Sequence, residues 1–266
     1  MVRSLWTGAS GMVAQQAQVD VISNNLANVN THGFKKQRAE FEDLIYQTLR
    51  VAGTPATENT VVPVGVQMGH GVRLAATQRV FSQGALQQTD VPTDMAIAGE
   101  GFFRVQMFDG SWAYTRNGTF TVDSDGRMVT SNGFWLLPDI IMPEGYLQDS
   151  VSVSRDGRVS VIVPDIDPNE RIEVGLIELY RFPNPVGLMA VGDNLFRVSA
   201  ASGEAIPGTP GFDGMGTIQN RFLEMSNVAI VQEMVNLIVA QRAYEFNSRT
   251  IQTSDSMLGT ATALRR

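Results

Sequence analysis

The chain of 266 residues has no cysteine and only two histidines. Without cysteine there is no disulfide, no thiolate nucleophile and no cysteine-ligated zinc, and the redox compartment stays undecided. The two histidines, His32 and His70, do not stand at a spacing typical of metal ligands. The usual residues of nucleophilic and metal-dependent catalysis are therefore scarce.

Positive charge is also scarce. Acidic residues number 27 against 20 basic ones, and the formal net charge is −7. The only lysines are the adjacent Lys35 and Lys36, while the arginines are dispersed along the chain. A nucleic-acid partner requires a basic surface that neutralises phosphates, and a membrane-surface patch requires a basic run. We expect neither kind of partner.

Long hydrophobic runs are missing as well. No stretch of eighteen apolar residues occurs, so no membrane-spanning helix and no membrane insertion are expected. The N-terminal segment has no basic region before an apolar block, and Gln15, Gln16 and Gln18 interrupt its apolar residues. This pattern argues against a cleavable signal peptide.

The fragments of catalytic or ligand-binding motifs are incomplete. Residues 99–101 (Gly-Glu-Gly) lack the third glycine of a nucleotide loop, and residues 123–126 (Asp-Ser-Asp-Gly) lack the remaining ligands of a calcium loop. Both patterns favour turns. Asp165 and Asp167 stand among prolines in a predicted loop. We expect no catalytic residue, no cofactor and no metal.

The C-terminal forty residues are the most informative part of the chain. From Ser226 the sequence is compatible with helix as far as Leu264, about 50 Å at 1.5 Å per residue. One stripe recurs every seven residues: Ile230, Leu237, Tyr244, Ile251 and Leu258. From Val228 to Ala240 the helix is apolar on nearly every side, so neighbours must cover it on several sides. Together with the family resemblance described below, this pattern implies contacts between subunits around residues 230–238 and pairing within the chain around residues 244–258.

The N-terminal thirty residues predict a second helix. Its apolar stripe is also spaced by seven: Leu5, Met12, Val19 and Leu26. Gly8 and Gly11 weaken its first turns by about 1 kcal/mol each relative to alanine. An asparagine-rich stretch follows, and Gly33 suits the left-handed residue that ends a helix, with Phe34 folding back as an apolar contact.

All eleven prolines lie between Pro55 and Pro210, in the middle of the chain. Residues 37–50 predict a short helical or extended arm, and residues 51–70 a connection. Beyond them, Asn-Gly or Asp-Gly pairs favour tight hairpins at residues 109–110, 117–118, 125–126, 132–133, 156–157 and 213–214. Strands are predicted at residues 101–107, 112–115, 119–122, 127–130, 151–153, 159–163 and 174–181.

These patterns predict an α+β protein in which both terminal helices, when paired, form one discontinuous helical domain and the middle forms an all-β domain. The family resemblance described below implies that the helical domain is a coiled coil. The helical domain takes residues 1–45 with 221–266. Residues 46–70 form a linker or extended segment, and residues 71–220 form the β-rich domain.

Three segments then resemble the bacterial flagellar rod and hook protein family. Residues 23–35 carry that family's Ala-Asn-x-x-Thr-x-Gly-Phe-Lys pattern at Ala27, Asn28, Thr31, Gly33, Phe34 and Lys35. Residues 99–103 with 114–120 resemble its β-domain motif, and residues 226–248 its C-terminal helix motif. Because the three motifs occur in order, the resemblance covers essentially the whole chain.

The resemblance implies a structural subunit that polymerises helically into a hollow drive shaft, with paired terminal helices inside and β domains outside. It implies these assembly residues: Leu5, Met12, Val19, Leu26, Asn28, Thr31, Gly33, Phe34, Ile230, Met234, Leu237, Ile238, Tyr244, Ile251 and Leu258. The implied partners are further copies, other rod proteins, the hook protein, the surrounding rings and the flagellar type III export apparatus. The implied location is the periplasmic rod of the basal body.

Within the family the chain is most similar to distal rod subunits, since Tyr46, Gln47, Thr48, Leu49 and Arg50 resemble the start of a rod-specific segment. A proximal rod protein or a hook-type subunit is the alternative inside the family. Two alternatives lie outside it. One is a soluble binding module with paired helices, and the other is a carbohydrate-active enzyme, which requires two carboxylates in one cleft of the β domain.

Overall fold

The computed structural model describes residues 2–53, 55–57, 60–61, 63–164 and 171–263. The chain divides into two compact units. Unit 1 is Met1–Ala27, Gln37–Gln78 and Ala229–Arg266, and unit 2 is Asn28–Lys36 and Arg79–Val228. Unit 1 holds both long helices and unit 2 is built of strands, so the predicted α+β class with joined terminal helices is confirmed.

The domain boundaries predicted from composition differ from those of the two units. Residues 28–36 and 221–228 were assigned to the helical domain but belong to the β unit, and residues 46–78 belong with the helices. The reason is hydrogen bonding. Backbone groups of Gly33 and Lys36 bond to Glu224 and Val80, inside the β unit.

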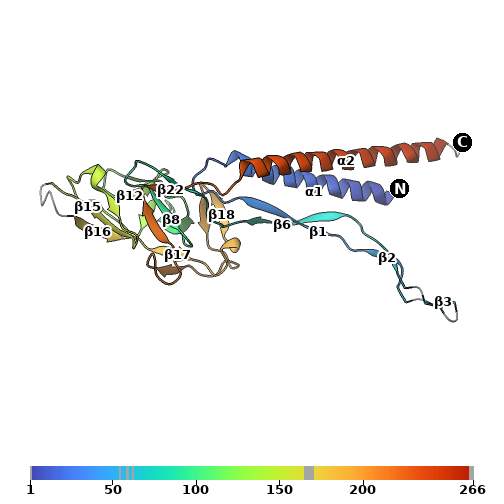
Figure 1. Ribbon diagram of the computed structural model, residues 1–266, viewed down its shortest axis with the longest axis horizontal. Coiled ribbons are helices and arrows are strands. Elements are labelled where there is room, and N and C mark those ends of the chain that lie inside the picture. The colour runs from blue at the N-terminus through green and yellow to red at the C-terminus, as the bar shows by residue number, and fades with distance from the viewer. Residues whose placement is uncertain (1, 54, 58–59, 62, 165–170, 264–266) are drawn as a thin grey trace. The chain divides into compact units, whose positions relative to one another are not determined.

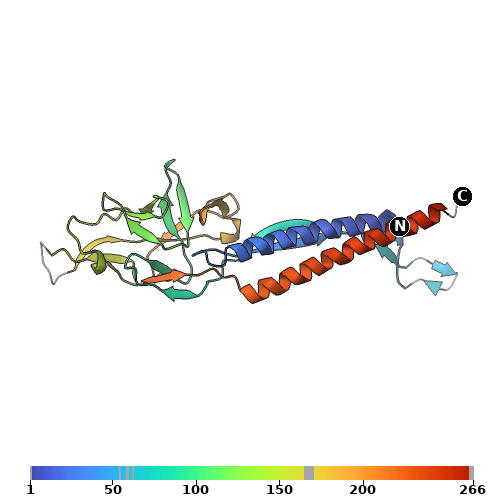
Figure 2. The ribbon, with the colours of Figure 1, turned by 90° about the horizontal axis from the view of Figure 1, so that it is seen from above.

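Two helices, α1 (Val2–Ala27) and α2 (Ile230–Ala263), form the main part of unit 1. They lie side by side and run in opposite directions, with both chain ends at the same end of the pair (Figure 1). Figure 2 shows the two helices separating toward the start of α2. The helix predicted from Ser226 begins four residues later, at Ile230, and Leu264 lies outside the described residues.

Small residues occupy the line of contact between α1 and α2. The Ser4 and Ser254 hydroxyl oxygens are 3.1 Å apart. A Cβ added at Gly8 would lie 3.0 Å from Ile251 Cγ1, and one at Gly11 only 2.7 Å from Asn247 Nδ2. The two glycines, expected to weaken the helix, therefore allow the close approach of α2. Pairing within the chain between residues 244 and 258 is confirmed.

Gly8→Leu is expected to separate the helices near residue 251. The pocket has no room for three further carbons beyond a Cβ at 3.0 Å, and overpacking costs about 1–3 kcal/mol. Hydrogen exchange of α2 amides around residues 247–254 should become faster. The control is Gly259→Leu, since an added Cβ there meets nothing within 4 Å. Unchanged exchange in Gly8→Leu would refute the close contact.

A strand-paired arm between residues 37 and 78 completes unit 1. Its strands are β1 (Gln37–Asp43), β2 (Gln47–Arg50), β3 (Pro55–Thr57), β4 (Thr60–Val61), β5 (Val66–Met68) and β6 (Val72–Arg79). They pair β1 with β6, β2 with β5 and β3 with β4. The extended alternative for residues 37–50 is thus the correct one. Asn25 joins the arm to α1, since its amide donates to Gln37 O and accepts from Gln37 N, both at 2.8 Å.

Unit 2 contains the remaining strands. In chain order they are β7 (Leu86–Gln88), β8 (Met95–Ala98), β9 (Phe103–Gln106), β10 (Trp112–Thr115), β11 (Phe120–Val122), β12 (Met128–Thr130), β13 (Trp135–Leu137), β14 (Ser152–Val153), β15 (Arg158–Val161), β16 (Ile172–Leu176), β17 (Leu179–Arg181), β18 (Met189–Gly192), β19 (Leu195–Arg197), β20 (Ile206–Gly208), β21 (Thr217–Asn220) and β22 (Phe222–Glu224). Two short 3-10 helices lie at Gln148–Ser150 and Pro185–Gly187.

The largest sheet has the order β11-β12-β13-β9-β10-β19-β18, beside a three-stranded sheet β14-β15-β16 and the pairs β17-β20, β21-β8 and β22-β7. Side chains from the seven-stranded sheet, the three-stranded sheet and the β21-β8 pair share one core, which includes Phe103, Val159 and Ile218. An aromatic cluster of edge-to-face rings, including Phe102, Tyr114 and Phe182, forms a second core.

Most of the β predictions hold. Six of the seven predicted strands overlap β9, β10, β11, β12, β14 and β15, and the seventh, residues 174–181, is divided between β16 and β17. Five predicted turn glycines have positive φ: Gly110, Gly126, Gly133, Gly157 and Gly214. The pair Asn117-Gly118 was wrongly predicted as a hairpin. Gly118 instead allows close approach of backbone, since an added Cβ would lie 1.5 Å from Met95 O.

Candidate functional site

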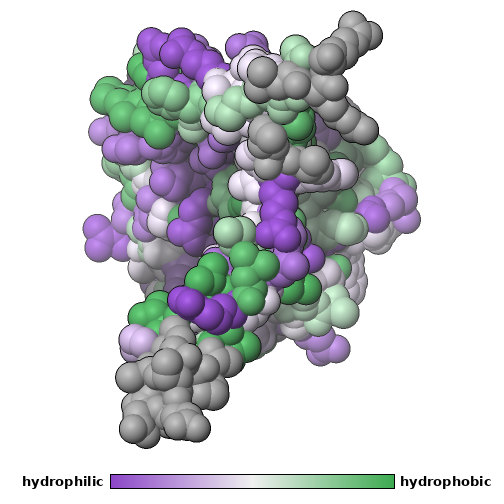
Figure 3. Space-filling view, turned by 90° about the vertical axis from the view of Figure 1, so that its right-hand side faces the viewer, coloured by the Kyte–Doolittle hydropathy of each residue, from purple (hydrophilic) through white to green (hydrophobic). Residues whose placement is uncertain are grey.

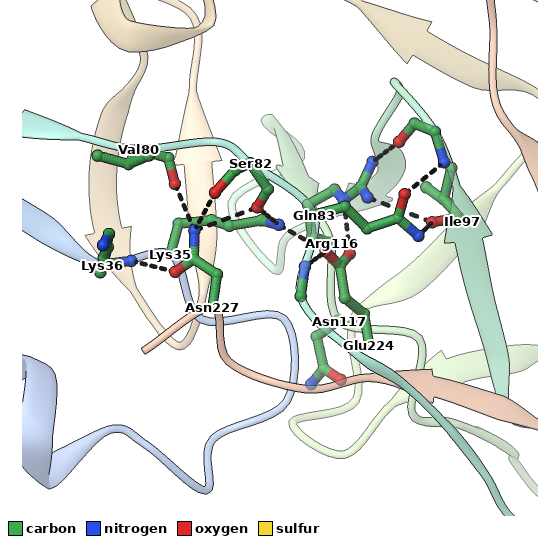
Figure 4. Close-up of polar contacts among 12 residues, drawn as sticks. Lys35, Lys36, Val80, Ser82, Gln83, Ile97, Arg116, Asn117, Glu224 and Asn227 are labelled. Atoms are coloured by element: carbon green, nitrogen blue, oxygen red, sulfur yellow. Dashed lines mark hydrogen bonds and ion pairs between the residues drawn. The ribbon is translucent and has the colours of Figure 1, made fainter. Parts of the chain in front are cut away.

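Three charged side chains from distant parts of the sequence meet inside unit 2. Lys35 follows the asparagine-rich turn, Arg116 follows β10, and Glu224 ends β22 (Figure 4). We call Lys35, Arg116 and Glu224 the buried ionic cluster. The Lys35 and Glu224 side chains have no exposed surface, and that of Arg116 is 5% exposed.

The Glu224 carboxylate is the centre of the cluster. Lys35 Nζ donates to its Oε1 at 2.5 Å and Arg116 Nε to its Oε2 at 2.8 Å. The backbone N of Gly84 also donates to Oε1, at 2.9 Å. Lys35 Nζ donates in addition to Ser82 O at 2.8 Å. Each carboxylate oxygen therefore has a charged donor.

Arg116 connects the cluster to the loop after β8. Its Nη1 donates to the carbonyls of Gly99 and Gly101 at 2.8 and 2.7 Å, and its Nη2 to Ile97 O at 3.2 Å. The Gln83 amide bonds to the same loop, since it accepts from Gly99 N at 3.0 Å and donates to Ile97 O at 3.3 Å. The carbonyl groups of Gly99 and Gly101 thus bind the guanidinium of Arg116.

The charges shift the ionisation of both partners of the carboxylate–ammonium pair. Burial by itself raises the pKa of the Glu224 carboxyl, but the charges of Arg116 and Lys35 outweigh burial and hold this pKa below its ordinary value. Burial, followed by the Arg116 charge, lowers the pKa of the Lys35 ammonium, and Glu224 only partly offsets this. The carboxylate is therefore firmly ionised at neutral pH.

Asn227 extends the network beyond the ionic cluster. Its side-chain oxygen accepts from Lys36 N at 2.8 Å, and its amide nitrogen donates to Val80 O at 2.8 Å and Ser82 O at 3.1 Å. Gly33, with φ +70°, makes the turn before Lys35. A Cβ there would lie 2.6 Å from Asn117 N, so the turn packs directly on the segment after Arg116.

The hydrogen bonds of this network join the segments around Lys35, Arg116 and Glu224 to one another, so the arrangement holds three distant parts of unit 2 together. Among the residues described, no set of three or more His, Cys, Asp or Glu side chains could hold a metal ion. The cluster was not predicted. In the sequence, Lys35 and Arg116 stand out only as members of the family motifs. No local pattern identifies Glu224 as their partner, because it lies 189 residues from Lys35 and 108 residues from Arg116.

A fragment comparison tests this organisation. Residues 28–228 include the whole buried ionic cluster and should unfold cooperatively on heating. Residues 71–220 are the β domain predicted from composition. This fragment lacks Lys35 and Glu224, so Arg116 is buried in it without the Glu224 carboxylate. Breaking a buried pair costs about 3–5 kcal/mol, so this fragment should fail to fold. Calorimetry of the two fragments measures their unfolding temperatures. Equal unfolding temperatures would contradict the role of the buried ionic cluster in stabilising unit 2.

The predicted assembly residues fall into three groups. On α1, Leu5, Met12, Val19 and Leu26 are half-buried, and on α2 so are Leu237, Ile251 and Leu258. Exposed residues on α2 are Ile230, Met234, Ile238 and Tyr244. In the turn, Asn28 and Thr31 are half-buried, with Thr31 Oγ1 3.2 Å from Asn28 Oδ1, while Gly33 and Phe34 are buried. The turn residues thus belong to unit 2 and not to the helix pair.

The first half of α2 exposes apolar side chains on more than one side. We call this the α2 apolar half: Ile230, Val231, Met234, Val235, Ile238 and Val239. Val231 is 76% exposed and Val239 is 62% exposed. Neither helix, as far as it is described, has the length and apolarity needed to cross a membrane.

The arm carries the predicted rod-specific residues. Tyr46 precedes β2, and Gln47, Thr48, Leu49 and Arg50 form that strand, all exposed. Further along the arm, Val51 and Val64 are also exposed, and hydrophobic surface borders the tip of the arm (Figure 3). Part of the predicted 46–70 segment, including residues 54, 58–59 and 62, lies outside the described residues.

A carbohydrate-active enzyme requires two carboxylates that converge in one cleft at catalytic spacing. Asp165 and Asp167 lie outside the described residues. Glu178 and Glu204 do line one groove of unit 2, of about 580 Å³, together with Arg104, Trp112 and Tyr180. The Tyr180 hydroxyl donates to Glu178 Oε2 at 2.7 Å.

Comparison with known proteins matches both ends and the middle of the chain. Residues 5–35 match the flagella basal body rod protein family, residues 96–161 the flagellar hook protein FlgE/F/G D1 domain, and residues 219–264 the flagellar basal body rod FlgEFG protein C-terminal domain. The first two segments contain Lys35 and Arg116, and the third contains Glu224.

Individual relatives agree. The flagellar basal-body rod protein FlgG of Borreliella burgdorferi is 58% identical over 266 residues, all of both chains. That of Bacillus subtilis is 39% identical, again over 100% of each chain. The flagellar hook protein FlgE of Helicobacter mustelae is 45% identical over 154 residues, which is 56% of this chain and 34% of the hook protein.

Proposed function

The chain belongs to the flagellar basal-body rod protein family, as a structural subunit of the flagellar rod, and we propose that its copies join head to tail into a helical, hollow shaft that transmits torque from the motor to the hook. Contacts of this heterologous kind do not close on themselves, so they propagate a filament. In this proposal α1 and α2 line the inside of the shaft and the β unit lies outside.

The exposed apolar side chains of the α2 apolar half are the main observation that supports this proposal. Monomeric soluble proteins rarely expose large contiguous apolar patches, and such patches mark interaction sites. Met234, Val235 and Ile238 are each about half exposed, although the same helix is closely packed on α1 further along, at Ile251 and Ser254. Apolar faces of neighbouring copies can cover this surface, and repetition of the contact gives a stiff shaft.

The distal rod is the position within the shaft that we favour. Full-length similarity to rod proteins named FlgG supports it, whereas the hook protein match spans only 34% of that protein. The exposed arm, with Tyr46 to Arg50 at the start of its β2–β5 pair, offers a further surface for neighbours along the shaft. A proximal rod protein remains the alternative.

The other proposed properties follow from this position. The partners are further copies, the other rod proteins, the hook protein and the ring proteins that surround the shaft. The location is the periplasmic part of the basal body, reached through the flagellar type III export apparatus. The role is mechanical and requires no catalytic residue.

Analytical ultracentrifugation with electron microscopy tests the proposal. A purified chain that sediments as a monomer at low concentration and forms long tubes or fibres above a critical concentration supports the shaft. A small oligomer of fixed size at all concentrations supports instead the soluble binding module with paired helices.

A further inference from the structure

One face of the seven-stranded sheet carries two tryptophans in register. Trp112 on β10 and Trp135 on β13 both lie directly opposite Gln106 on the strand between them, β9. Residues directly opposite in antiparallel strands share one face of a sheet. The neighbouring positions Val105, Ala113 and Leu136 point into the core and are buried. We call Trp112, Gln106 and Trp135 the tryptophan face.

Each indole of the tryptophan face contacts a guanidinium. Arg104 Cζ is 5.0 Å from the Trp112 ring centre and 4.4 Å from that of Tyr180, and Arg127 Cζ is 4.8 Å from the Trp135 ring centre. In such cation–π contacts the guanidinium is attracted to the electron-rich face of the ring. Trp112 is nevertheless 57% exposed and Trp135 41% exposed. Each ring therefore keeps a large surface open to solvent.

The spacing of the two rings is set by the sheet. Adjacent strands lie about 4.7–4.9 Å apart, so residues two strands apart are separated by roughly 9.5 Å. Next to Trp112 is the groove of about 580 Å³ that contains Glu178 and Glu204. In the part of the chain that the structure describes, neither carboxylate takes part in an ion pair, and Arg104 Nε is buried without a hydrogen-bond partner.

We propose that the tryptophan face binds an extended β-1,4-linked polysaccharide chain. In such a chain each sugar ring is turned over relative to the next, so alternate rings present the same face, at a repeat close to the separation of the two tryptophans. The apolar C–H faces of two alternate sugars pack against the indoles, which offer large apolar surfaces. The Gln106 amide, between the indoles, bonds to the intervening sugar, and the groove carboxylates accept from hydroxyl groups.

A repeating polymer fits this face better than a second copy of the chain does. Residues that dominate protein interfaces cluster in packed pockets near the centre of the contact, surrounded by a rim that excludes water. Here the two indoles stand in a straight row across three strands, with one amide midway between them. Regular spacing and polar groups in the row are properties of a surface for a periodic, hydroxyl-rich ligand.

Tryptophan fluorescence of the full-length chain tests the proposal. Because the chain has three tryptophans, Trp6→Phe leaves only Trp112 and Trp135 as reporters. The probes are chitohexaose, a β-1,4-linked hexamer of N-acetylglucosamine, and maltohexaose, whose α-1,4 linkages curve the chain. We expect a saturable change in emission with chitohexaose and none with maltohexaose. No change with chitohexaose, or an equal response to both sugars, would overturn the proposal.

Retention on insoluble chitin gives the second measurement. The double variant Trp112→Ala, Trp135→Ala should bind about tenfold more weakly or worse, since both stacking contacts are lost. The matched control is Phe212→Ala, another exposed aromatic residue of unit 2, which should bind normally. The double variant should also polymerise normally. If the double variant fails to polymerise and the wild-type protein is not retained on chitin, the tryptophan face is instead a contact between copies. That result would contradict the proposal.

Discussion

Glu224→Gln is expected to lower the free energy of unfolding of unit 2 by about 3–5 kcal/mol, because it leaves two buried cations without their counter-charge. The substitution keeps the size of the side chain, and an amide oxygen can still accept from Gly84 N. The loss therefore reports on charge and not on packing. Lys35 Nζ retains only Ser82 O as a described acceptor, which does not neutralise an ammonium.

Urea unfolding monitored by tryptophan fluorescence in a Trp6→Phe background measures this loss in unit 2. Glu173→Gln is the matched control, because Glu173 pairs with Arg158 at 3.2 Å but both side chains are more than half exposed. Exposed pairs contribute about 0–1 kcal/mol. A Glu224→Gln loss no larger than that of the control would contradict the buried ionic cluster as a determinant of the fold.

The same carboxylate gives unit 2 a dependence on acid. The pKa of Glu224 in the folded protein lies below its ordinary value of 4.5, so the unfolded chain binds the proton more tightly. The stabilisation is therefore complete above about pH 4.5 and is lost as the pH falls toward the folded pKa. The Glu224→Gln variant should show a flatter decline in this range than the wild-type protein.

Ile238→Asp is expected to abolish polymerisation and leave both units folded. Ile238 is 56% exposed in the single chain, so a carboxylate there remains hydrated and the fold is spared. In the proposed polymer other copies cover the same position, and burying an unpaired carboxylate there would cost several kcal/mol in every subunit. Sedimentation above the critical concentration measures assembly, and circular dichroism measures the fold.

The control for this variant adds the same charge elsewhere on the helix. Gln252 is exposed on the second half of α2, outside the α2 apolar half. Gln252→Asp should polymerise with at most a modest rise in critical concentration. Normal tubes from Ile238→Asp, or equal loss of assembly in both variants, would refute a specific role of the α2 apolar half.

Local sequence patterns predicted those parts of the fold that depend on local interactions. Asp-Gly and Asn-Gly pairs located five positive-φ turns, and hydrophobic spacing located both helices to within a few residues at their described ends. The predicted pairing region of α2 is correct, since Ile251 of the predicted stripe lies against Gly8. The small residues Gly8, Gly11 and Ser254 on the contact line were not predicted, although only small side chains allow this close approach.

Long-range polar contacts could not be predicted in the same way. The sequence around Glu224 does not indicate that Glu224 pairs with Lys35. The sequence around Asn227 does not indicate that its side chain forms hydrogen bonds with three separate backbone groups. The boundaries between the two compact units depend on these contacts, which explains why residues 28–36 and 221–228, assigned by composition to the helical domain, lie in the unit of strands. The arm was ambiguous because residues 37–50 suit either an amphipathic helix or a strand.

Cysteine labelling tests most directly whether neighbouring copies cover the α2 apolar half. The native chain has no cysteine, so Val239→Cys introduces a single thiol at a position that is 62% exposed in the single chain. A maleimide should react quickly with the monomer and at least about tenfold more slowly with the polymer, as expected for a thiol that must wait for local opening. Gln252→Cys serves as the comparison within the same helix. Equal labelling rates at residue 239 in monomer and polymer would contradict the account.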